Sequence, residues 1–294
     1  MALDTKLHRH KRRYTIGDAL VTALLTLLAL LIFVPFYNAL IISVQTGRAH
    51  VLNPVALFPT EFTLENYRII LKSGFIQTGY RNTLLVTVGG TLFSMAIMVM
   101  MAYAFSRKAF PGKKPLFMLT LFTMFFSGGM VPTYLMMRDM GLINNLLSII
   151  LLGGIGAYYI IIMKTGFEQT PEALEEAGRI DGASDLRIFI SIMLPLQGPI
   201  LATFTLFTLV TYWNSWFWPL LLINSADKMT LQVILRAIIS EMDFSDTDST
   251  EVMLAYDQGV KMAAVVLTML PIMLVYPFLQ KHFAKGVMIG AIKM

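Results

Sequence analysis

The sequence predicts an all-α integral membrane protein with about six transmembrane helices. Of its 294 residues, 56% are hydrophobic and only 14% are charged, and the mean hydropathy is +0.67. Soluble domains carry about 25% charged residues to cover their surface, so much of this surface is expected to face lipid. Six stretches are also long and apolar enough to cross a hydrocarbon core of about 30 Å as helices, with basic residues at their ends.

The expected spans cover residues 18–44, 83–105, 115–137, 143–163, 190–223 and 260–279. The first is interrupted by Pro35, and it is too long for a cleaved signal peptide and lacks a small-residue cleavage site. The third contains Gly128, Gly129 and Pro132 in its later half. The fifth exceeds one span, so its turns before Pro195 are expected at the cytoplasmic surface.

Positive charge beside the spans predicts their orientation, because cytoplasmic flanks retain lysine and arginine. The basic clusters are Lys6, Arg9, Lys11, Arg12 and Arg13 at the start, Arg107, Lys108, Lys113 and Lys114 after the second span, and Lys281, Lys285 and Lys293 at the end. Both termini are therefore expected in the cytoplasm. The outer segment 225–259 is acidic, through Asp227, Glu241, Asp243, Asp246, Asp248, Glu251 and Asp257, which is typical of a solvated loop.

Composition also excludes several kinds of site. The net charge is +5, but the basic residues flank apolar stretches and form no continuous stripe, so we expect no nucleic-acid partner. The absence of cysteine excludes disulfides and thiolate metal sites. The histidines His8, His10, His50 and His282 form no pair with metal-ligand spacing, so no metal site is expected.

The connection KTGFEQTPEALEEAGRIDGASDLRIF, residues 164–189, reads as two short cytoplasmic helices. Thr170 is a good N-cap for the first helix, and Pro171 suits its first position. Gly178 and Gly182 permit close approach or a turn, and Ser184 can cap the second helix. Ala173, Leu174 and Ala177 share one side of the first helix, whereas Glu175, Glu176 and Arg179 project elsewhere. On amphipathicity alone, an ordinary surface helix would explain this pattern.

The spacing within this loop is more specific. It matches the EAA motif of ABC importer permeases, written as EAA, three residues, Gly, nine residues, Ile, any residue, Leu-Pro. The matching residues are Glu176, Ala177, Gly182, Ile192, Leu194 and Pro195. Gly178 stands where a second alanine is usual, which weakens the local helix by about 1 kcal/mol.

The whole chain resembles the carbohydrate-uptake, MalG-type branch of these bacterial inner-membrane permeases. The stretches that carry this resemblance are FTLENYR, RNTLLVT, RIDGAS, TYWNSWFWPLL and YPFLQKHFAKGVMIGAIK. The resemblance implies a basic cytoplasmic tail at 1–17 and a permease domain at 18–294. That domain would include the cytoplasmic EAA loop 164–190, the outer loop 225–259 and a C-terminal tail 280–294.

The resemblance further implies how the chain works. The short cytoplasmic helix would be a coupling helix seated on an ATPase subunit, through Glu172, Leu174, Glu175, Glu176, Ala177, Gly178, Asp181, Gly182 and Ala183. Lys285 and Gly286 of the tail would also touch the ATPases. The expected partners are a second related permease, two ATPase subunits, an extracytoplasmic solute-binding protein that the outer loop would reach, membrane lipid, and an oligosaccharide or polysaccharide. Close relatives of this branch handle uronic-acid polymers such as alginate, and the net charge of this chain does not discriminate between neutral and acidic sugars.

No GxxxxGK[ST] motif occurs in the chain, so no cofactor is expected in it, and ATP with Mg would be bound by the partner ATPases. The apolar spans contain almost no ionisable residues, which argues against an ion-coupled secondary transporter. The sequence shows neither paired carboxylates nor a nucleophile with a base, so we do not expect an enzyme. A non-sugar solute remains an alternative substrate.

Polar and aromatic side chains at membrane depth are the candidates for the sugar path. They are Asn82, Thr83 and Thr87 in the second span and Thr208, Tyr212, Trp213 and Asn214 in the fifth. An interfacial aromatic belt and helix packing by small polar residues would equally explain them. The spans contain no obvious lysine or arginine that could bind the carboxylate of an acidic sugar.

Overall fold

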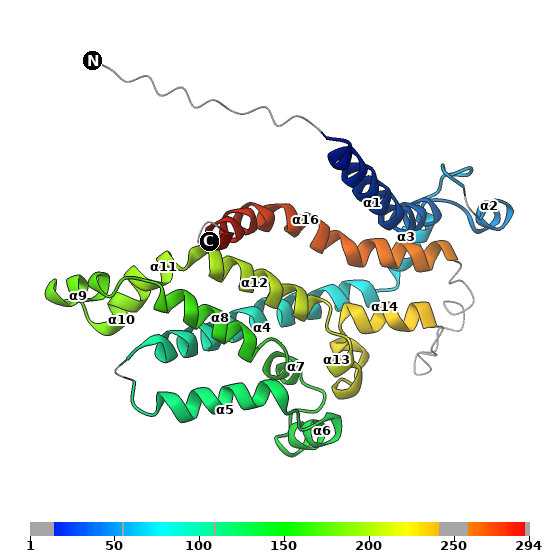
Figure 1. The fold of residues 1–294 in the computed structure, drawn as a ribbon. Helices are drawn as coiled ribbons and strands as arrows, with labels where there is room; N and C mark the ends of the chain where they lie inside the picture. Colours follow the sequence, from blue (N-terminus) through cyan, green and yellow to red (C-terminus); the bar gives the residue numbers. More distant parts are fainter. Residues whose placement is uncertain (1–14, 55, 109, 241–257, 292–294) are drawn as a thin grey trace.

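The computed structural model describes residues 15–54, 56–108, 110–240 and 258–291 (Figure 1). Helices dominate these ranges, and the β-pairing found within them is one isolated antiparallel bridge between Gln45 and Phe62. The described part of the chain is therefore all-α. Most of the basic tail lies outside the described residues, as does the part of the acidic segment from 241 to 257, which holds six of its seven carboxylates.

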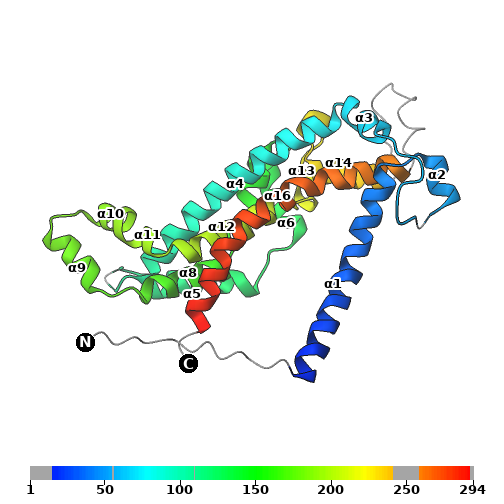
Figure 2. The ribbon, with the colours of Figure 1, turned by 90° about the horizontal axis from the view of Figure 1, so that it is seen from above.

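The first helix, α1 (Ile16–Ser43), begins with a capping box between Thr15 and Asp18. Pro35 lies inside it without ending it, so the expected interruption does not occur. Only the last turns are covered, and the apolar side chains before them are exposed. Figure 2 shows α1 standing apart from the other helices except at its C-terminal end. The short helices α2 (Gly47–Leu52) and α3 (Glu65–Lys72) follow.

The central element is α4 (Phe75–Ser106), which begins eight residues before the expected second span. Around it lie α8 (Ala157–Glu168), α12 (Gly198–Trp213), α7 (Leu146–Leu152) and α14 (Leu231–Ser240). The main hydrophobic core forms where α4 and α8 meet the segment before α12. Its buried residues include Met98, Phe105, Met163, Phe167 and Ile188.

Three of the expected spans are each formed by two helices that meet at a bend, and the bend in the fifth lies just after Pro195. The bends are 118° between α5 (Lys113–Phe125) and α6 (Met130–Asp139), 55° between α7 and α8, and 82° between Asp185–Leu196 and α12. Counting each bent pair as one span gives six candidate spans, together with α1, α4 and the first part of α16 (Gln258–Ala291). This number agrees with the expected six.

Local sequence explains two of the bends. Gly129, with φ of +87°, opens the corner between α5 and α6 in a conformation that favours glycine. Gln197, Gly198 and Pro199 form the corner before α12, where proline suits the first turn of a new helix. Upstream of this corner lie α10 (Asp185–Ile188), the π-helical turn Phe189–Met193 and α11 (Leu194–Leu196).

The end of the fifth span also differs from expectation. α12 stops at Trp213, and the short helix α13 (Phe217–Leu222) follows it. Beyond a 3-10 turn at Ala226–Lys228, the segment expected to be an outer loop forms α14. Leu231, Ile234 and Ile238 of α14 are buried in a second core with Trp213 and Val260, which explains why this part is helical.

Candidate functional site

The EAA loop forms α9 (Ala173–Ile180), a tight turn and α10. Gly182 makes the turn with φ of +75°, and Ser184 caps α10 by accepting a hydrogen bond from the Arg187 N–H, so both predictions are confirmed. The predicted cap at Thr170 is wrong. Its hydroxyl accepts a hydrogen bond from Gln197 Nε2 at 2.9 Å, and Glu172 occupies the N-cap position without a side-chain cap.

One side of α9 is apolar and uncovered. Ala173, Leu174, Ala177 and Ile180 are exposed, and Ile180 is 86% exposed. Glu176, Asp181 and Gly182 are exposed as well, whereas Ala183 is half-buried against the main core. In Figures 1 and 2, α9 and α10 project at one end of the molecule. Apolar side chains on a projecting helix are typical of a surface that another protein covers.

Gly178 lies on the opposite, buried side of α9. A Cβ atom at this position would lie 3.0 Å from Ile192 Cδ1 and 3.2 Å from Ile188 Cγ1, so these side chains would have to shift by a few tenths of an ångström. The glycine that departs from the EAA motif therefore permits α9 to pack closely on α10 and on the π-helical turn that follows it. This packing offsets the helix propensity that glycine lacks.

Glu175 is also on the buried side, although it was expected to project. Its carboxylate forms an ion pair with Arg107, the residue after α4, and the two side chains are only 11% and 21% exposed. Arg107 also donates to the carbonyl of Phe167 at the end of α8 and lies over the Tyr103 ring, 4.7 Å from its centroid. Burial lowers the pKa of Arg107. Arg107 thus joins α4, α8 and α9.

Further ion pairs, some exposed and some partly buried, surround this attachment. Lys108 pairs with Glu172 at 2.5 Å. The hydrogen bond that Lys108 donates to the Glu172 carboxylate, together with its positive charge, lowers the pKa of Glu172. Glu168 pairs with Lys164 at 2.7 Å and with Lys113 at 3.7 Å. A further pair, between Arg179 and Asp185 at 3.4 Å, joins α9 to α10. The positive connection after α4 and the negative residues of the EAA loop therefore lie together.

Two of the candidate path residues hold the chain after α13 against α4. The Asn82 side-chain amide donates to the carbonyls of Asp227 and Met229, both at 2.9 Å. The Thr83 hydroxyl accepts a hydrogen bond from the Leu231 N–H at 2.8 Å, at the start of α14. Both side chains are buried. Their observed partners are backbone groups of this chain.

Tyr212 occupies a cage of glycines. Its ring lies against Gly90, Gly153 and Gly154, where any Cβ atom would overlap it. Its hydroxyl donates to the carbonyl of Ile150 at 2.6 Å and lies 2.8 Å from Ser94 Oγ. The break between α7 and α8 accommodates this ring, which explains the bend of the fourth span. The adjacent glycines Gly89–Gly90 and Gly153–Gly154 are the sequence signal for this contact, which was not predicted from the sequence.

The remaining candidates differ in exposure. Thr87, Thr208 and Trp213 are buried within this chain, and Trp213 belongs to the second core. Asn214, after the last turn of α12, is exposed. Phe207 and Thr211 are exposed at helical spacing from it, so the three share one face of α12, and sequence reasoning had not placed Phe207 among the candidates. Lys285 and Gly286 lie in the last part of α16.

The comparisons with known proteins agree with this arrangement. Residues 81–289 match the family model described as "Binding-protein-dependent transport system inner membrane component". Two Bacillus subtilis (strain 168) proteins are each 40% identical. The first is named "Polygalacturonan/rhamnogalacturonan transport system permease protein YtcP", with 94% of this chain and 98% of that protein covered. The second is "Protein LplC", with 81% of each covered.

A solved structure is similar over almost its whole length. It is described as a bacterial ABC transporter involved in the import of the acidic polysaccharide alginate, and the match has a TM-score of 0.85 and 32% identity. It covers 92% of this chain and 99% of the other. The chain therefore belongs to the binding-protein-dependent transport system inner membrane components, as a permease subunit of a carbohydrate-uptake ABC importer.

Proposed function

We propose that this permease subunit carries an acidic oligosaccharide or polysaccharide across the cytoplasmic membrane, powered by ATP hydrolysis on two partner ATPase subunits. The names of the 40% identical polygalacturonan/rhamnogalacturonan relative and of the alginate importer support this substrate class. Both names refer to polymers that contain uronic acids. A solute-binding protein outside the membrane would deliver the saccharide, and a second related permease would complete the path.

The single observation that carries the mechanism is the exposed apolar side of α9, fixed to the transmembrane helices by Arg107 and Glu175. We propose that Leu174, Ala177 and the exposed residues around them, Glu172, Glu176, Asp181 and Gly182, contact an ATPase subunit. The buried Glu175 and Gly178 and the half-buried Ala183 would instead hold α9 in place. A rigid attachment of this kind transmits a rigid-body motion to α4 and α8.

The same proposal assigns the sides of the membrane. Lys108 and Lys113 lie beside the EAA loop, which supports a cytoplasmic position for that end, with both chain termini there. The segment after α13 would then face outward, toward the binding protein. Lys285 and Gly286, near the end of α16, would approach the ATPases. Lipid or the second permease would cover the exposed apolar side chains of α1.

For the saccharide path, we propose the exposed face of α12 formed by Phe207, Thr211 and Asn214. An aromatic ring and two polar groups offer a sugar both a flat apolar surface and hydrogen bonds. The buried candidates Asn82, Thr83, Thr87, Thr208, Tyr212 and Trp213 would then act by holding this face in position.

ATP hydrolysis in proteoliposomes tests the function. The vesicles would hold this chain, its co-purified partners and the binding protein, with acidic and neutral oligosaccharides added in turn. We expect stimulation by acidic saccharides that Glu176→Ala reduces, whereas Glu65→Ala, at an exposed carboxylate of α3, leaves it unchanged. An intact complex that no saccharide stimulates would contradict the proposal and favour a different solute.

A further inference from the structure

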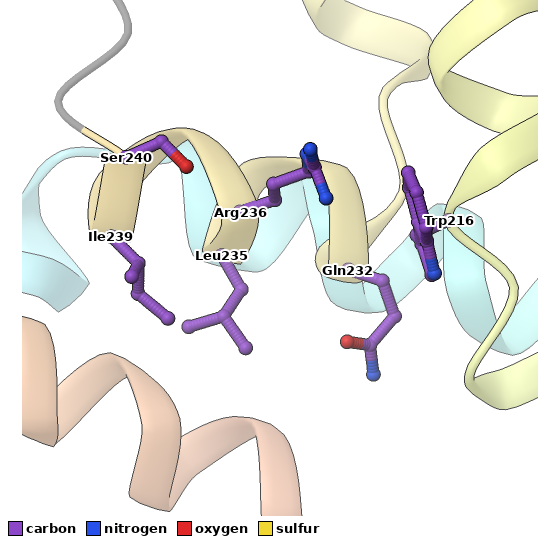
Figure 3. A pocket seen from close by; sticks show the side chains of 6 residues that line it. All are labelled: Trp216, Gln232, Leu235, Arg236, Ile239 and Ser240. Carbon is purple, nitrogen blue, oxygen red and sulfur yellow. The ribbon is translucent and has the colours of Figure 1, made fainter.

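A groove of about 300 Å³ lies between α14 and the corner that precedes α13 (Figure 3). Its lining residues are Trp216, Gln232, Leu235, Arg236, Ile239 and Ser240. The groove is at the end of the molecule away from α9 (Figures 1 and 2). Its volume lies at the lower end of the range for small-molecule sites, about 300–1,000 Å³. It has room for one ligand unit and not for a long chain segment.

The charged group of the groove is Arg236, stacked on an aromatic ring. Its guanidinium carbon lies 4.4 Å from the centroid of the Trp216 ring. Stacking covers one face of the guanidinium and leaves its N–H edge available for a planar anion. None of the ion pairs found among the described residues involves Arg236. Within that part of the chain its charge is therefore available to a ligand.

The other lining residues form a rigid frame of mixed polarity. Gln232, Leu235, Arg236 and Ile239 recur at helical spacing and share one face of α14. The opposite face is fixed, because Leu231, Ile234 and Ile238 are buried in the second core. Trp216 is 41% exposed and packs edge to face on Phe217, with ring centroids 5.7 Å apart. The aromatic ring of Trp216, the amide of Gln232 and the guanidinium of Arg236 thus line the same groove.

We propose that this groove binds one uronic-acid unit of an acidic saccharide. The Arg236 guanidinium donates two parallel hydrogen bonds to the sugar carboxylate, which is the geometry that arginine offers to planar anions. The exposed part of the Trp216 ring and Ile239 contact the apolar face of the pyranose, and the Gln232 amide bonds a ring hydroxyl. This inference rests on the proposed transport function and gives its acidic substrate a specific recognition residue.

A direct binding measurement tests the groove separately from transport. The transporter complex, without its binding protein, is placed in phosphatidylcholine nanodiscs and titrated with trigalacturonate and with the carboxyl-reduced trisaccharide of the same linkage. Ligand-detected NMR reports both affinities. We expect the acidic probe to bind about tenfold more tightly, as a charge-assisted bidentate pair implies. Omitting the binding protein removes its own saccharide site from the measurement.

Arg236→Gln should abolish the preference for the acidic probe, and Trp216→Ala should weaken both probes. Arg48→Gln, at an exposed arginine of α2, is the matched control and should keep the preference. Equal binding of both probes to the unmodified complex, or an unchanged preference in Arg236→Gln, would overturn the inference. If saccharide-stimulated ATP hydrolysis persists in that case, the proposed function stands and only the groove assignment fails.

Discussion

Arg107 and Glu175 form an ion pair that fastens the short helix α9 to the end of α4, and both side chains are largely buried. A buried charge without its partner is costly, so this contact is sensitive to the loss of either residue. The Arg107 bond to the Phe167 carbonyl extends the attachment to α8. Both an ion pair and apolar contacts therefore hold α9 against the rest of the chain.

Glu175→Ala should lower the free energy of unfolding by about 3 kcal/mol, because it leaves the Arg107 charge buried and unpaired. Thermal denaturation of the purified complex measures this loss. The double variant Arg107→Met with Glu175→Leu should recover most of the stability, since it removes both charges. Glu176→Ala, which removes an exposed neighbouring carboxylate, is the control. Equal melting temperatures for Glu175→Ala and Glu176→Ala would show that the pair does not hold α9.

The Tyr212 cage predicts a second effect. Gly153→Ala should destabilise the protein by about 1–3 kcal/mol, because its Cβ atom would overlap the Tyr212 ring. Tyr212→Phe should cost about 1 kcal/mol by removing the hydroxyl contacts to Ile150 and Ser94. Gly128→Ala, with open space around the position, should be close to neutral. Thermal denaturation of the three variants measures these losses of stability. An equal loss in Gly128→Ala and Gly153→Ala would contradict the proposed cage.

The exposed pair of Lys108 and Glu172 predicts a pH dependence. Lys108 lowers the folded-state pKa of Glu172, so the contribution of this pair is complete above the unfolded-state pKa and is lost as the pH falls through the folded-state value. Coupled ATP hydrolysis by Glu172→Gln and by the unmodified complex should therefore keep a constant ratio between about pH 6 and pH 8. A ratio that changes within this interval would mean that another group controls the α9 attachment.

The exposed face of α12 predicts effects on transport without effects on folding. Thr211→Ala and Asn214→Ala should slow saccharide uptake while leaving the melting temperature unchanged, because both side chains are exposed. Thr26→Ala in α1 is the control, since its hydroxyl, like that of Thr211, bonds the carbonyl four residues earlier. Normal uptake in both α12 variants would exclude this face from the saccharide path.

Turn and cap chemistry in the EAA loop could be predicted from sequence because it depends on near neighbours. Gly182 and Ser184 act through the residues beside them, and the structure agrees with both predictions. Thr170 failed as a cap because Gln197, distant in sequence, bonds its hydroxyl. Glu175 was misplaced for the same kind of reason, since its partner Arg107 comes from another helix.

The bends of the spans were harder to predict, since hydropathy reports length and apolarity and not direction. The corner between α7 and α8 depends on the Tyr212 ring from α12. The helix α14 likewise forms in a segment that looked like a loop, because its apolar side packs on Trp213 and Val260. Arg236 was overlooked because only cations within the spans were considered for an acidic sugar, and its contact with Trp216 is tertiary.

The most direct test of the central claim is crosslinking from the exposed side of α9 to the ATPase subunits. The chain contains no cysteine, so Leu174→Cys introduces its single thiol, with Leu57→Cys as an exposed control far from α9 in sequence. A thiol crosslinker added to the assembled complex should join position 174 to an ATPase subunit, and should not join position 57. Absence of a crosslink from position 174 in a complex that still hydrolyses ATP would contradict the assignment of α9 as the coupling helix.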